Sequence, residues 1–476
     1  MKKNVLLLNP PLSSEERGGA LKAAVAKSIP YGLLSLASVL RQDGYTVTIL
    51  DATNLEQGVE AAARQVIERR PDYLGITTVT LSVEKAALVA ELVKTRFPTM
   101  TIIVGGAHIS SAPRQTLELL TSFDIGVIGE GEETLLEVLH RLDDGRRVDD
   151  VLGIVYRKAG AVVMNKRRPL LSNLDILPMP AWDLLDGMPG FYRPSAPSYL
   201  RLPSTTIVTS RGCNGNCLFC NSKALFGRLR CFSAEYVIAM IGHLKGAYGI
   251  RDISVYDDNF ILDRERAVKI CREMIEARMD LTWSCYSRAD QGDAELFALM
   301  KRAGCWQISY GIESGSQMIL DFLGKGVRLE QIRETVMATK KAGIRARGFF
   351  IIGHMKETRE TIKQTTRFMR SIPLDDFHFT CFTPLPGTRA YSIADQYGSF
   401  DHAWNKTNMQ TPVFIPVGLT AKDLEKYSKQ AYLRFYFRPR ILATYLKTLI
   451  RYPANVGRLL KGLAALTSRI FSKAKA

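Results

Sequence analysis

The sequence lacks the features that mark a membrane-spanning or secreted protein. No apolar stretch of about 18 residues occurs among its 476 residues, so no helix is expected to cross a membrane. The opening stretch, MKKNVLLLNPP, has four consecutive apolar residues, which is too few for a signal-peptide core and predicts a buried strand instead. The eight cysteines need not be disulfide staples, because a chain of this length can bury a sizeable core. We therefore expect a protein of the reducing cytoplasm.

Acidic residues are missing from the end of the chain. From Arg434 to Ala476 there are ten Lys or Arg and no Asp or Glu, so this segment supplies ten of the seventeen net positive charges. Large apolar residues alternate with the basic ones, which predicts a helix at a membrane surface or on an anionic partner. A solvated face, or a helix docked back on the body, fits equally well. A nucleic-acid footprint fits less well because of the large aliphatic residues.

Residues 1–145 alternate short apolar runs with helix-like patterns. The runs begin at Asn4, Thr46, Tyr73, Thr101 and Asp124, and most are continuous, as in strands that are covered on both faces. Between them, apolar residues recur every three or four positions. This alternation predicts an α/β fold with a doubly wound, Rossmann-like parallel sheet, which binds ligands beyond the carboxyl ends of its strands.

The rest of the chain divides into three further regions. Residues 146–203 lose the pattern and are rich in proline towards their end, which indicates a linker that wraps a surface. Residues 204–390 repeat the alternation and predict a partial (β/α)6 barrel of the TIM type, with active groups on the loops after the strands. Residues 391–476 predict a basic helical extension. The barrel strands are expected to begin near Thr205, Ile253, Thr282, Gln307, Ala346 and Phe377.

Three of the cysteines lie close together, directly after the first predicted barrel strand. Cys213, Cys217 and Cys220 have the spacing C-x3-C-x2-C. A cubane [4Fe–4S] cluster usually takes four cysteines, so three leave one iron open to a substrate or a cofactor. The spacing alone also permits zinc, and Cys231 is then a candidate fourth ligand.

The motif at this place in a βα barrel resembles the signature of radical S-adenosylmethionine enzymes. Phe219 matches the aromatic residue that commonly precedes the last cysteine of that signature. In the family, the open iron chelates the amine and carboxylate of S-adenosylmethionine, and an electron from the cluster cleaves this cofactor to a 5′-deoxyadenosyl radical. The resemblance implies a [4Fe–4S] cluster on Cys213, Cys217 and Cys220, bound S-adenosylmethionine, and an external electron donor of the flavodoxin or ferredoxin type.

Other residues at the predicted barrel mouth resemble the cofactor contacts of the family. Asp257, Asp258 and Asn259 follow the second strand, Arg288 ends the third and Glu313 ends the fourth. The resemblance implies contacts with the ribose, the amine and the carboxylate of S-adenosylmethionine, and a guanidinium is suited to a carboxylate by bidentate pairing. Each residue alone also fits a structural role, the first three as a helix cap and the last two as an ion pair.

The N-terminal sheet resembles the cobalamin-binding domain that some radical S-adenosylmethionine enzymes carry, and this resemblance covers nearly the full chain. The stretches LNPP, GGAHISSAP and GEGEET lie at carboxyl ends of strands, where glycines permit close approach of a corrin or its nucleotide tail. A nucleotide-binding or purely structural sheet is the alternative, and the absence of G-x-G-x-x-G disfavours a dinucleotide. The implied cobalamin contacts are Asn9, Pro10, Gly105, Gly106, His108, Ser110, Ser111, Gly129, Glu130, Gly131 and Thr134.

Histidine is scarce, with six residues in the chain, and the D-x-H-x-x-G cobalt-ligating pattern of methionine synthase is absent. The resemblance therefore implies cobalamin bound with its tail displaced and with no protein histidine on cobalt. His108 alone lies on a loop of the N-terminal sheet after glycines. We expect His108 to contact the nucleotide tail, or to contact residues that themselves bind the cofactor, rather than to bind cobalt.

The leading hypothesis is a cobalamin-dependent radical S-adenosylmethionine enzyme that methylates an unactivated carbon. A cyclase, oxidase or rearrangement enzyme of the porphyrin-cyclase type is the first alternative. RNA methylthiotransferases carry extra cysteines in the N-terminal domain, whereas none precedes Cys213 here, so nucleic acid is not the expected partner. A non-catalytic Fe–S or cobalamin-binding module is a further alternative. The apolar, basic tail predicts a small-molecule or lipid-like substrate and an enzyme peripheral to the membrane.

Overall fold

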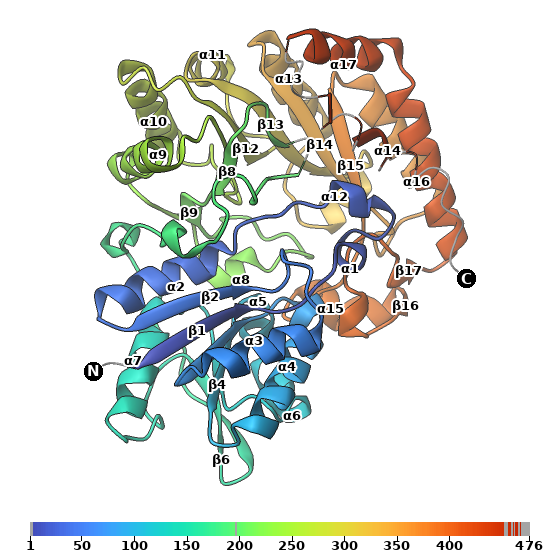
Figure 1. The fold of residues 1–476 in the computed structure, drawn as a ribbon. Coiled ribbons are helices and arrows are strands. Elements are labelled where there is room, and N and C mark those ends of the chain that lie inside the picture. The colour runs from blue at the N-terminus through green and yellow to red at the C-terminus, as the bar shows by residue number, and fades with distance from the viewer. Residues whose placement is uncertain are drawn as a thin grey trace.

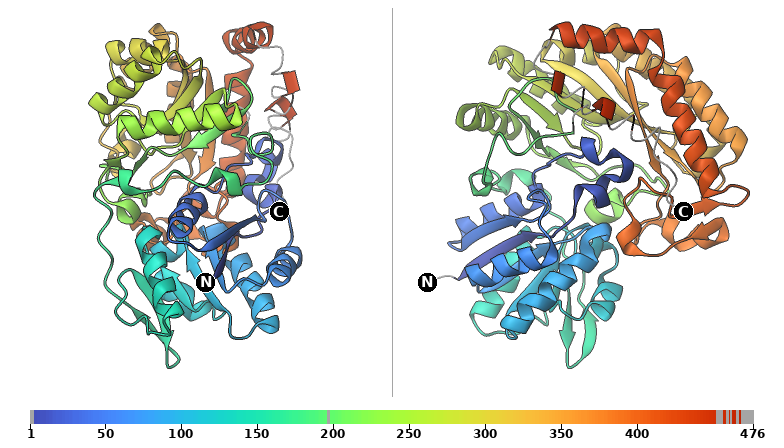
Figure 2. Two further views of the ribbon diagram at one scale, coloured as in Figure 1. Left: turned by 60° about the vertical axis from the view of Figure 1, so that its left-hand side comes forward. Right: turned by 45° about the vertical axis from the view of Figure 1, so that its right-hand side comes forward.

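Residues 3–195, 198–451, 456–457, 460, 462–464 and 467 are described by the computed structural model. They form two sheet-based halves, one above the other in Figure 1, and the last helices run along the side of the second half. Figure 2 shows the same two halves from two further sides. The predicted combination of a Rossmann-like sheet and a partial barrel is confirmed.

Five parallel strands form the main part of the first sheet, in the order β2-β1-β3-β4-β5. Residues alternate between its faces, so Leu6 and Leu8 pack with α3 and α4, whereas Val5 and Leu7 pack with α2 and α7. Helices on both faces explain why the strands read as continuous apolar runs. The strands are β1 (Asn4–Asn9), β2 (Thr46–Asp51), β3 (Tyr73–Thr77), β4 (Thr101–Gly105) and β5 (Ile125–Val127), and the helices are α1 (Ser14–Gly18), α2 (Tyr31–Gln42), α3 (Val59–Arg69), α4 (Val83–Arg96), α5 (Ala107–Ser111), α6 (Pro113–Leu119) and α7 (Glu132–Asp143).

Two further strands of this sheet come from the segment that was expected to be a linker. β6 (Ile154–Lys158) and β7 (Ala161–Met164) form a hairpin, and β6 pairs antiparallel with β5. The turn between them is Ala159–Gly160, whose φ angles of 49° and 83° are both positive, as a tight hairpin requires. The expected linker over residues 146–203 therefore differs from the structure, because residues 154–164 extend the sheet at its edge.

The second sheet has six parallel strands in the order β15-β14-β13-β12-β11-β8. It curls into part of a barrel, with helices on its outer side (Figure 1). The strands are β8 (Ser204–Ile207), β11 (Asp252–Val255), β12 (Thr282–Arg288), β13 (Cys305–Glu313), β14 (Arg345–Ile352) and β15 (Asp376–Cys381), and the helices are α9 (Ala234–Tyr248), α10 (Arg264–Glu276), α11 (Ala294–Arg302), α12 (Gln317–Phe322), α13 (Leu329–Lys341) and α14 (Arg359–Ser371).

Local sequence determines where several barrel helices begin. Ser233, Asp263, Asp293 and Thr358 each precede a helix, and each side chain accepts a hydrogen bond from the backbone N–H three residues further on. Gly249 ends α9 with a left-handed φ of 62°. Because all six barrel strands run parallel, the loops that follow them gather at one end of the barrel.

The remainder of the expected linker packs between the two halves. Trp182 is fully buried, shares a core with Leu34 of α2, and stacks on His243 of α9 with ring centroids 5.7 Å apart. Tyr236 of α9 donates a hydrogen bond to the carbonyl oxygen of Leu177 at 3.1 Å. The segment therefore fastens the first sheet to the barrel.

The C-terminal helices cover the edge strand β15. Phe377 contacts the rings of Tyr432 and Phe435 on α16 (Ala421–Tyr436) with centroids 4.7 Å apart in both pairs. Each helix of the described ranges is too short or too polar to span a membrane. Much of the predicted basic extension beyond Arg451 lies outside the described residues. The remaining elements here are α15 (Arg389–Ile393), β16 (Gly398–Phe400), β17 (Phe414–Pro416) and α17 (Pro439–Arg451).

Candidate functional site

The three clustered cysteines lie on one loop, which leaves the short strand β9 (Ser210–Arg211) and returns through α8 (Ser222–Phe226) to β10 (Arg230–Cys231). Cys213, Cys217 and Cys220 are all free thiols. Gly212 has a φ of +84°, and a Cβ there would lie 2.5–2.8 Å from the carbonyl oxygens of residues 226–228. Only glycine fits at this close approach, which holds the start of the loop against its end.

Two thiols and a guanidinium surround Gly215. A Cβ placed on Gly215 would lie 3.5 Å from Sγ of Cys213, 3.8 Å from Sγ of Cys217 and 3.6 Å from a terminal nitrogen of Arg288. Burial raises the pKa of Cys217, and the positive charges of Lys325 and Arg288 act against this rise. Cations beside buried thiols stabilise the thiolate, which is the form that binds iron.

The donor set fits a cluster better than a single metal ion. Among the described residues, no three His, Cys, Asp or Glu side chains converge closely enough to hold one ion. Cys231, the candidate zinc ligand, lies on β10, where burial raises its pKa to about 11 and Arg266 and Asp257 are the nearby charges. A [4Fe–4S] cluster takes one cysteine per iron, so its ligands stand further apart than those of a single ion.

The last cysteine of the loop, Cys220, is exposed as a residue, but its sulfur is surrounded by protein atoms that desolvate it. Burial raises the pKa of Cys220 to about 11, so this group needs a metal to become a thiolate near neutral pH. Leu218 fixes the intervening backbone, because its N–H donates to the carbonyl oxygen of Leu323 at 2.8 Å. Phe219 packs against the apolar cluster that contains Leu218 and Leu323. In this structure Phe219 is therefore a packing residue next to Cys220.

The three polar residues after β11 have different surroundings. Asp257 is buried and accepts hydrogen bonds from the backbone N–H and the hydroxyl of Thr209, each at 2.6 Å. Asp258 accepts a hydrogen bond from Ser222, and burial raises its pKa. Asn259 is buried, and its Nδ2 has no partner among the described residues. Asp257 therefore joins two barrel loops, whereas the Nδ2 of Asn259 is a hydrogen-bond donor that has no protein partner among the described residues.

Arg288 and Glu313 each have an ionic partner of their own. Arg288 binds both carboxylate oxygens of Asp290, at 3.0 and 2.8 Å. Oε1 of Glu313 lies 2.7 Å from Nζ of Lys325, a residue that sequence reasoning missed. The backbone of Glu313 has a φ of +67° next to a shift in strand register. Such strain persists where the surroundings enforce it, and it often accompanies function.

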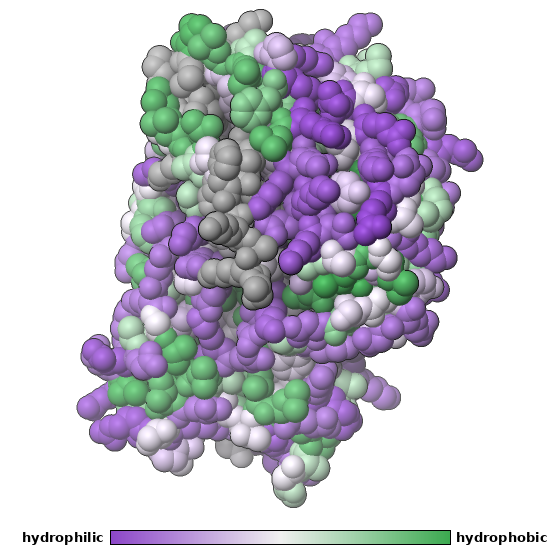
Figure 3. Space-filling model, turned by 90° about the vertical axis from the view of Figure 1, so that its right-hand side faces the viewer, coloured by the Kyte–Doolittle hydropathy of each residue, from purple (hydrophilic) through white to green (hydrophobic). Residues whose placement is uncertain are grey.

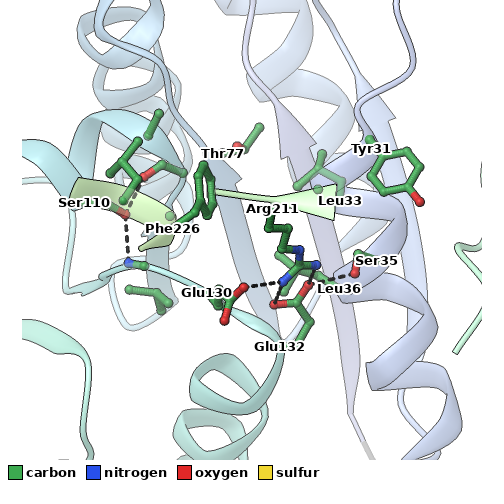
Figure 4. A pocket seen from close by; sticks show the side chains of 18 of the residues that line it. Tyr31, Leu33, Ser35, Leu36, Thr77, Ser110, Glu130, Glu132, Arg211 and Phe226 are labelled. Carbon is green, nitrogen blue, oxygen red and sulfur yellow. Dashed lines mark hydrogen bonds and ion pairs between the residues drawn. The ribbon is translucent and has the colours of Figure 1, made fainter. Parts of the chain in front are cut away.

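A cavity of about 360 Å³ lies between the N-terminal sheet and the cysteine loop (Figure 4). Its wall is formed by the ends of β3, β4 and β5, the starts of α2 and α7, and residues 208, 210–212, 225 and 226 around the cysteine loop. This volume is within the range of small-molecule sites. Much of the wall is apolar, through Leu7, Leu33, Leu36, Ile76, Ile103, Val127 and Leu135.

Several of the predicted residues line this cavity. Ser110 connects two loops, because its hydroxyl accepts a hydrogen bond from the Gly129 N–H at 2.9 Å and donates to the carbonyl oxygen of Gly106 at 2.8 Å. A Cβ on Gly105 or on Gly129 would meet no atom within 4 Å, so the backbone there is open to a ligand. The predicted residues in the lining are Gly105, Gly106, Ser110, Gly129, Glu130, Gly131 and Asp258.

Other predicted cobalamin contacts have protein partners and are not part of this lining. Asn9 donates to an aspartate at the end of β2, at 2.8 Å, and the carbonyl oxygen of Pro10 accepts a threonine hydroxyl. The hydroxyl of Thr134 accepts a hydrogen bond from an arginine at 2.9 Å. Ser111 accepts one from Asn221 of the cysteine loop at 2.6 Å. In this structure, these four residues connect elements of the protein.

His108 also packs within the protein. Its ring contacts Trp404 edge-on with centroids 4.4 Å apart, and Nδ1 lies 3.2 Å from the hydroxyl of Thr80. Burial lowers the pKa of His108 to about 4, so the ring is neutral at pH 7. Its Nε2 has no partner within the described part of the chain. The cavity wall does not include this residue.

Of the charged residues in the cavity wall, sequence analysis predicted Glu130 and Asp258 but missed Arg211 and Glu132. Arg211 pairs with Glu130 at 2.9 Å and with Glu132 at 2.5 Å, and Ser35 donates to Glu132 at 2.8 Å (Figure 4). Tyr31 donates to the carbonyl oxygen of residue 208 at 3.1 Å and lines the same cavity. A weak signal was present, since Arg211 precedes the cysteine motif by two positions and Glu132 lies within the GEGEET stretch.

Comparison with known proteins identifies the family. The family model of the B12 binding domain matches residues 20–139, and that of the radical SAM superfamily matches residues 207–369. An uncharacterised methyltransferase of Pyrococcus horikoshii is 35% identical over 442 residues, which are 92% of this chain and 93% of that protein. The chain belongs to the cobalamin-dependent radical S-adenosylmethionine enzymes.

More distant members of this enzyme family have several activities. An anaerobic magnesium-protoporphyrin IX monomethyl ester cyclase of Rubrivivax gelatinosus is 26% identical over 425 residues, 87% of this chain and 74% of that protein. Among solved structures, the methyltransferase TsrM from Kitasatospora setae has a TM-score of 0.68 at 20% identity, covering 90% of this chain and 82% of its own. The cobalamin-dependent enzyme OxsB has a TM-score of 0.74 at 18% identity, covering 98% and 72%. At these identities the two structures support the fold alone.

These comparisons confirm the predicted family and the cofactors that define it. The cofactors of a cobalamin-dependent radical S-adenosylmethionine enzyme are a [4Fe–4S] cluster, S-adenosylmethionine and cobalamin. The individual residues that hold them in this enzyme stay predictions.

Proposed function

We propose that this enzyme methylates an unactivated carbon of a small-molecule substrate. The observation that carries the proposal is the position of the cavity, whose wall joins the glycine loops of the N-terminal sheet to Arg211, Gly212 and Phe226 beside the cysteine loop. A cofactor on the sheet and a cluster on the loop would therefore be neighbours. Methyl transfer to a carbon radical needs this closeness, because the methyl donor and the radical must meet at one substrate carbon.

The cysteine loop and the cations next to it form the proposed cluster site. When bound, the cluster and S-adenosylmethionine supply the radical that abstracts hydrogen, and cobalamin supplies the methyl group. Cys213, Cys217 and Cys220 are the ligands in this proposal, and the charges of Lys325 and Arg288 favour the thiolate form of Cys217. The guanidinium of Arg288 is also suited to the carboxylate of S-adenosylmethionine.

Two further residues of the barrel mouth are assigned to S-adenosylmethionine. Asn259 supports this through its buried Nδ2, which has no partner among the described residues and can donate to a ribose hydroxyl. Glu313 supports it through its carboxylate at the end of β13, which can accept from the amine of the cofactor and already accepts a hydrogen bond from Lys325 at 2.7 Å. Asp257 has the different function of holding the loops that carry these groups in place.

The cavity is the proposed site of the nucleotide tail of cobalamin. Its wall combines apolar side chains with the Ser110 hydroxyl, a combination that suits a nucleotide tail with its apolar base and polar linker. The open backbone at Gly105 and Gly129 permits the tail to lie against the protein chain.

Methyl transfer is preferred to cyclisation because the relative at 35% identity is named a methyltransferase, whereas the cyclase is 26% identical. The test is an anaerobic incubation of the reconstituted enzyme with cobalamin, a reductant, a cell-derived metabolite extract and S-adenosylmethionine labelled in the methyl group. The expected result is a labelled product together with S-adenosylhomocysteine and 5′-deoxyadenosine. Release of 5′-deoxyadenosine with product formation but no label in that product would instead favour a cyclase or oxidase.

Two partners belong to this proposal. An external one-electron donor of the flavodoxin or ferredoxin type would supply two electrons in each turnover, one to the cluster for cleavage of S-adenosylmethionine and one to return cobalamin to the form that accepts a new methyl group. The second partner is an anionic membrane surface, which α17 would contact. Leu442, Leu446 and Ile450 are 56%, 59% and 73% exposed and are spaced by four residues on one helix, whereas Ile441 faces the body and is buried. Figure 3 shows hydrophobic surface at the top of the face that carries the C-terminal helices.

The membrane contact is tested by flotation with vesicles that contain anionic lipid. The variant Leu442→Gln/Leu446→Gln/Ile450→Gln is expected to lose binding, because the apolar ridge supplies the buried area and the basic residues supply the attraction. Met337→Gln is the matched control, since Met337 is 55% exposed on a different helix. Substitution is preferable to deletion from Arg434, because deletion removes Phe435 from the core. Equal partitioning of both variants would reject the contact and the lipid-like substrate class.

A further inference from the structure

Arg211 stands at the centre of a buried set of charges that connects the two halves of the enzyme (Figure 4). The side chains of Arg211, Glu130 and Glu132 are only 13%, 7% and 6% exposed. Arg230 of β10 binds both oxygens of Glu130, each at 3.0 Å. Burial alone would raise the pKa of Glu130, but hydrogen bonds from Arg230 and Arg211 hold it below its usual value. Both carboxylates are therefore paired, as buried charges must be.

The other end of the cysteine loop carries a second link to the N-terminal sheet. Asn221, directly after Cys220, donates from Nδ2 to the hydroxyl of Ser111 at 2.6 Å. Ser111 lies on α5, which follows β4. Because Arg211 precedes Cys213 by two residues, the loop is fastened to the N-terminal sheet on both sides of its three cysteines.

Both links begin on the loops that line the cavity. Glu130 lies between Gly129 and Gly131, and all three line the wall. α5 begins after Gly106, which lines the wall as well. A ligand that orders these loops therefore orders the groups that hold the cysteine loop. By thermodynamic linkage, a cluster that orders the cysteine loop must improve the affinity of the cavity by the same factor.

We infer that Glu130, Glu132 and Arg211, together with the Ser111–Asn221 pair, are positioning residues that couple occupancy of the cavity to the geometry of the cysteine loop. The inference rests on the proposed assignment of the cavity to cobalamin. These residues act through the two loops and need not touch the reacting atoms. They fix the separation of the two cofactor sites, on which a transfer between them depends steeply.

The test compares the affinity for hydroxocobalamin with and without the reconstituted cluster. In the wild-type enzyme, the cluster is expected to tighten binding by about fivefold or more. The variant Arg211→Gln/Glu132→Gln removes one positive and one negative charge together, so no buried charge is left unpaired, and Glu130 keeps Arg230. In this variant the ratio of the two affinities is expected to fall to about one, while hydroxocobalamin still binds.

A second readout follows the cysteine loop directly and needs no cluster. Hydroxocobalamin is expected to slow amide hydrogen exchange in residues 211–221 of the wild-type protein, and this effect should disappear in the double variant. Ser111→Ala removes the hydrogen bond from Asn221 and the bond that the same hydroxyl donates to the carbonyl oxygen of Ala107 within α5, and it is expected to weaken the effect. It therefore carries the test if the double variant does not fold. Glu133→Gln is the matched control, because Glu133 follows Glu132 but is 50% exposed.

The outcomes separate the inference from the proposed function. Binding of hydroxocobalamin to the wild-type enzyme with no effect of the cluster on affinity would overturn the coupling alone. If the double variant shows the same affinity ratio as the wild-type enzyme, the assignment of these residues is overturned. If the double variant does not fold, unchanged protection of the cysteine loop in Ser111→Ala would overturn it instead. Failure of the cluster-loaded wild-type enzyme to bind hydroxocobalamin would overturn the assignment of the cavity and the coupling with it.

Discussion

Nζ of Lys325 lies 2.7 Å from Oε1 of Glu313, and both side chains are buried beside the cysteine loop. The backbone oxygen of Lys325 also accepts a hydrogen bond from Arg288 at 2.8 Å. The ammonium of Lys325 thus balances a buried carboxylate and brings a positive charge to Cys217. Removing one partner leaves the other as an unpaired buried charge.

The Glu313–Lys325 pair is expected to show strong coupling in stability. Lys325→Met is predicted to lower the free energy of unfolding by about 3–5 kcal/mol, because the carboxylate of Glu313 is left without its partner. The double variant Glu313→Gln/Lys325→Met should recover most of this loss. Urea denaturation of the protein without cofactors measures both effects. Equal losses in the single and the double variant would contradict the pairing.

The four cysteines around the first barrel strand are expected to differ in their effect on iron content. Cys217→Ser should abolish the visible absorption of a [4Fe–4S] cluster after anaerobic reconstitution, because a hydroxyl does not replace a thiolate ligand. Cys231→Ser should retain about four irons per chain, since Cys231 lies on β10, where it pairs with Ser210 of β9, and is not one of the three cysteines of the C-x3-C-x2-C motif. Iron and sulfide analysis checks both variants. Loss of metal in Cys231→Ser, or zinc in the wild-type protein, would revive the zinc hypothesis.

His108→Phe is expected to leave cobalamin binding unchanged within about twofold, because the ring of His108 packs on Trp404 and is not part of the cavity wall. Electron paramagnetic resonance of the bound cob(II)alamin should show no nitrogen splitting from an axial ligand in either protein. Splitting that is present in the wild-type enzyme and absent in His108→Phe would assign His108 to cobalt.

The buried carboxyl group of Glu357 is expected to make the free energy of unfolding depend on pH. Burial raises the pKa of Glu357 from 4.5 to about 8, so between these values the native state keeps a proton that the unfolded state has released. Its stabilising contribution is therefore complete below about pH 4.5 and is lost as the pH rises through about 8. The difference in unfolding free energy between wild type and Glu357→Gln should change across this range. A constant difference would show that Glu357 does not titrate there.

Much of the fold was predictable from the sequence because its signals are local. The apolar runs of β1 to β5 and the capped helices of the barrel follow from periodicity and from residues such as Ser233 and Asp263. The hairpin of β6 and β7 was missed because it is short and amphipathic strands at a sheet edge carry a weak pattern. The three cysteines were predicted to be cluster ligands because their spacing in the sequence is itself typical of iron–sulfur binding.

The parts of the site that the sequence did not indicate depend on contacts between distant residues. Arg211 and Glu130 are 81 positions apart in the chain, and nothing near either residue specifies the other. His108 was expected to serve the cobalamin site, yet its ring packs on Trp404, far along the chain. Lys325 was missed because its function comes from its distance to Glu313 and Cys217 in the folded protein.

The central claim is that three cysteines leave one iron of the cluster open for S-adenosylmethionine. The most direct measurement is electron–nuclear double resonance on the reduced, reconstituted enzyme mixed with S-adenosylmethionine that carries oxygen-17 in its carboxylate and nitrogen-15 in its amine. The account predicts hyperfine coupling of both nuclei to the cluster. A reduced [4Fe–4S] cluster that shows no such coupling at saturating S-adenosylmethionine would contradict it.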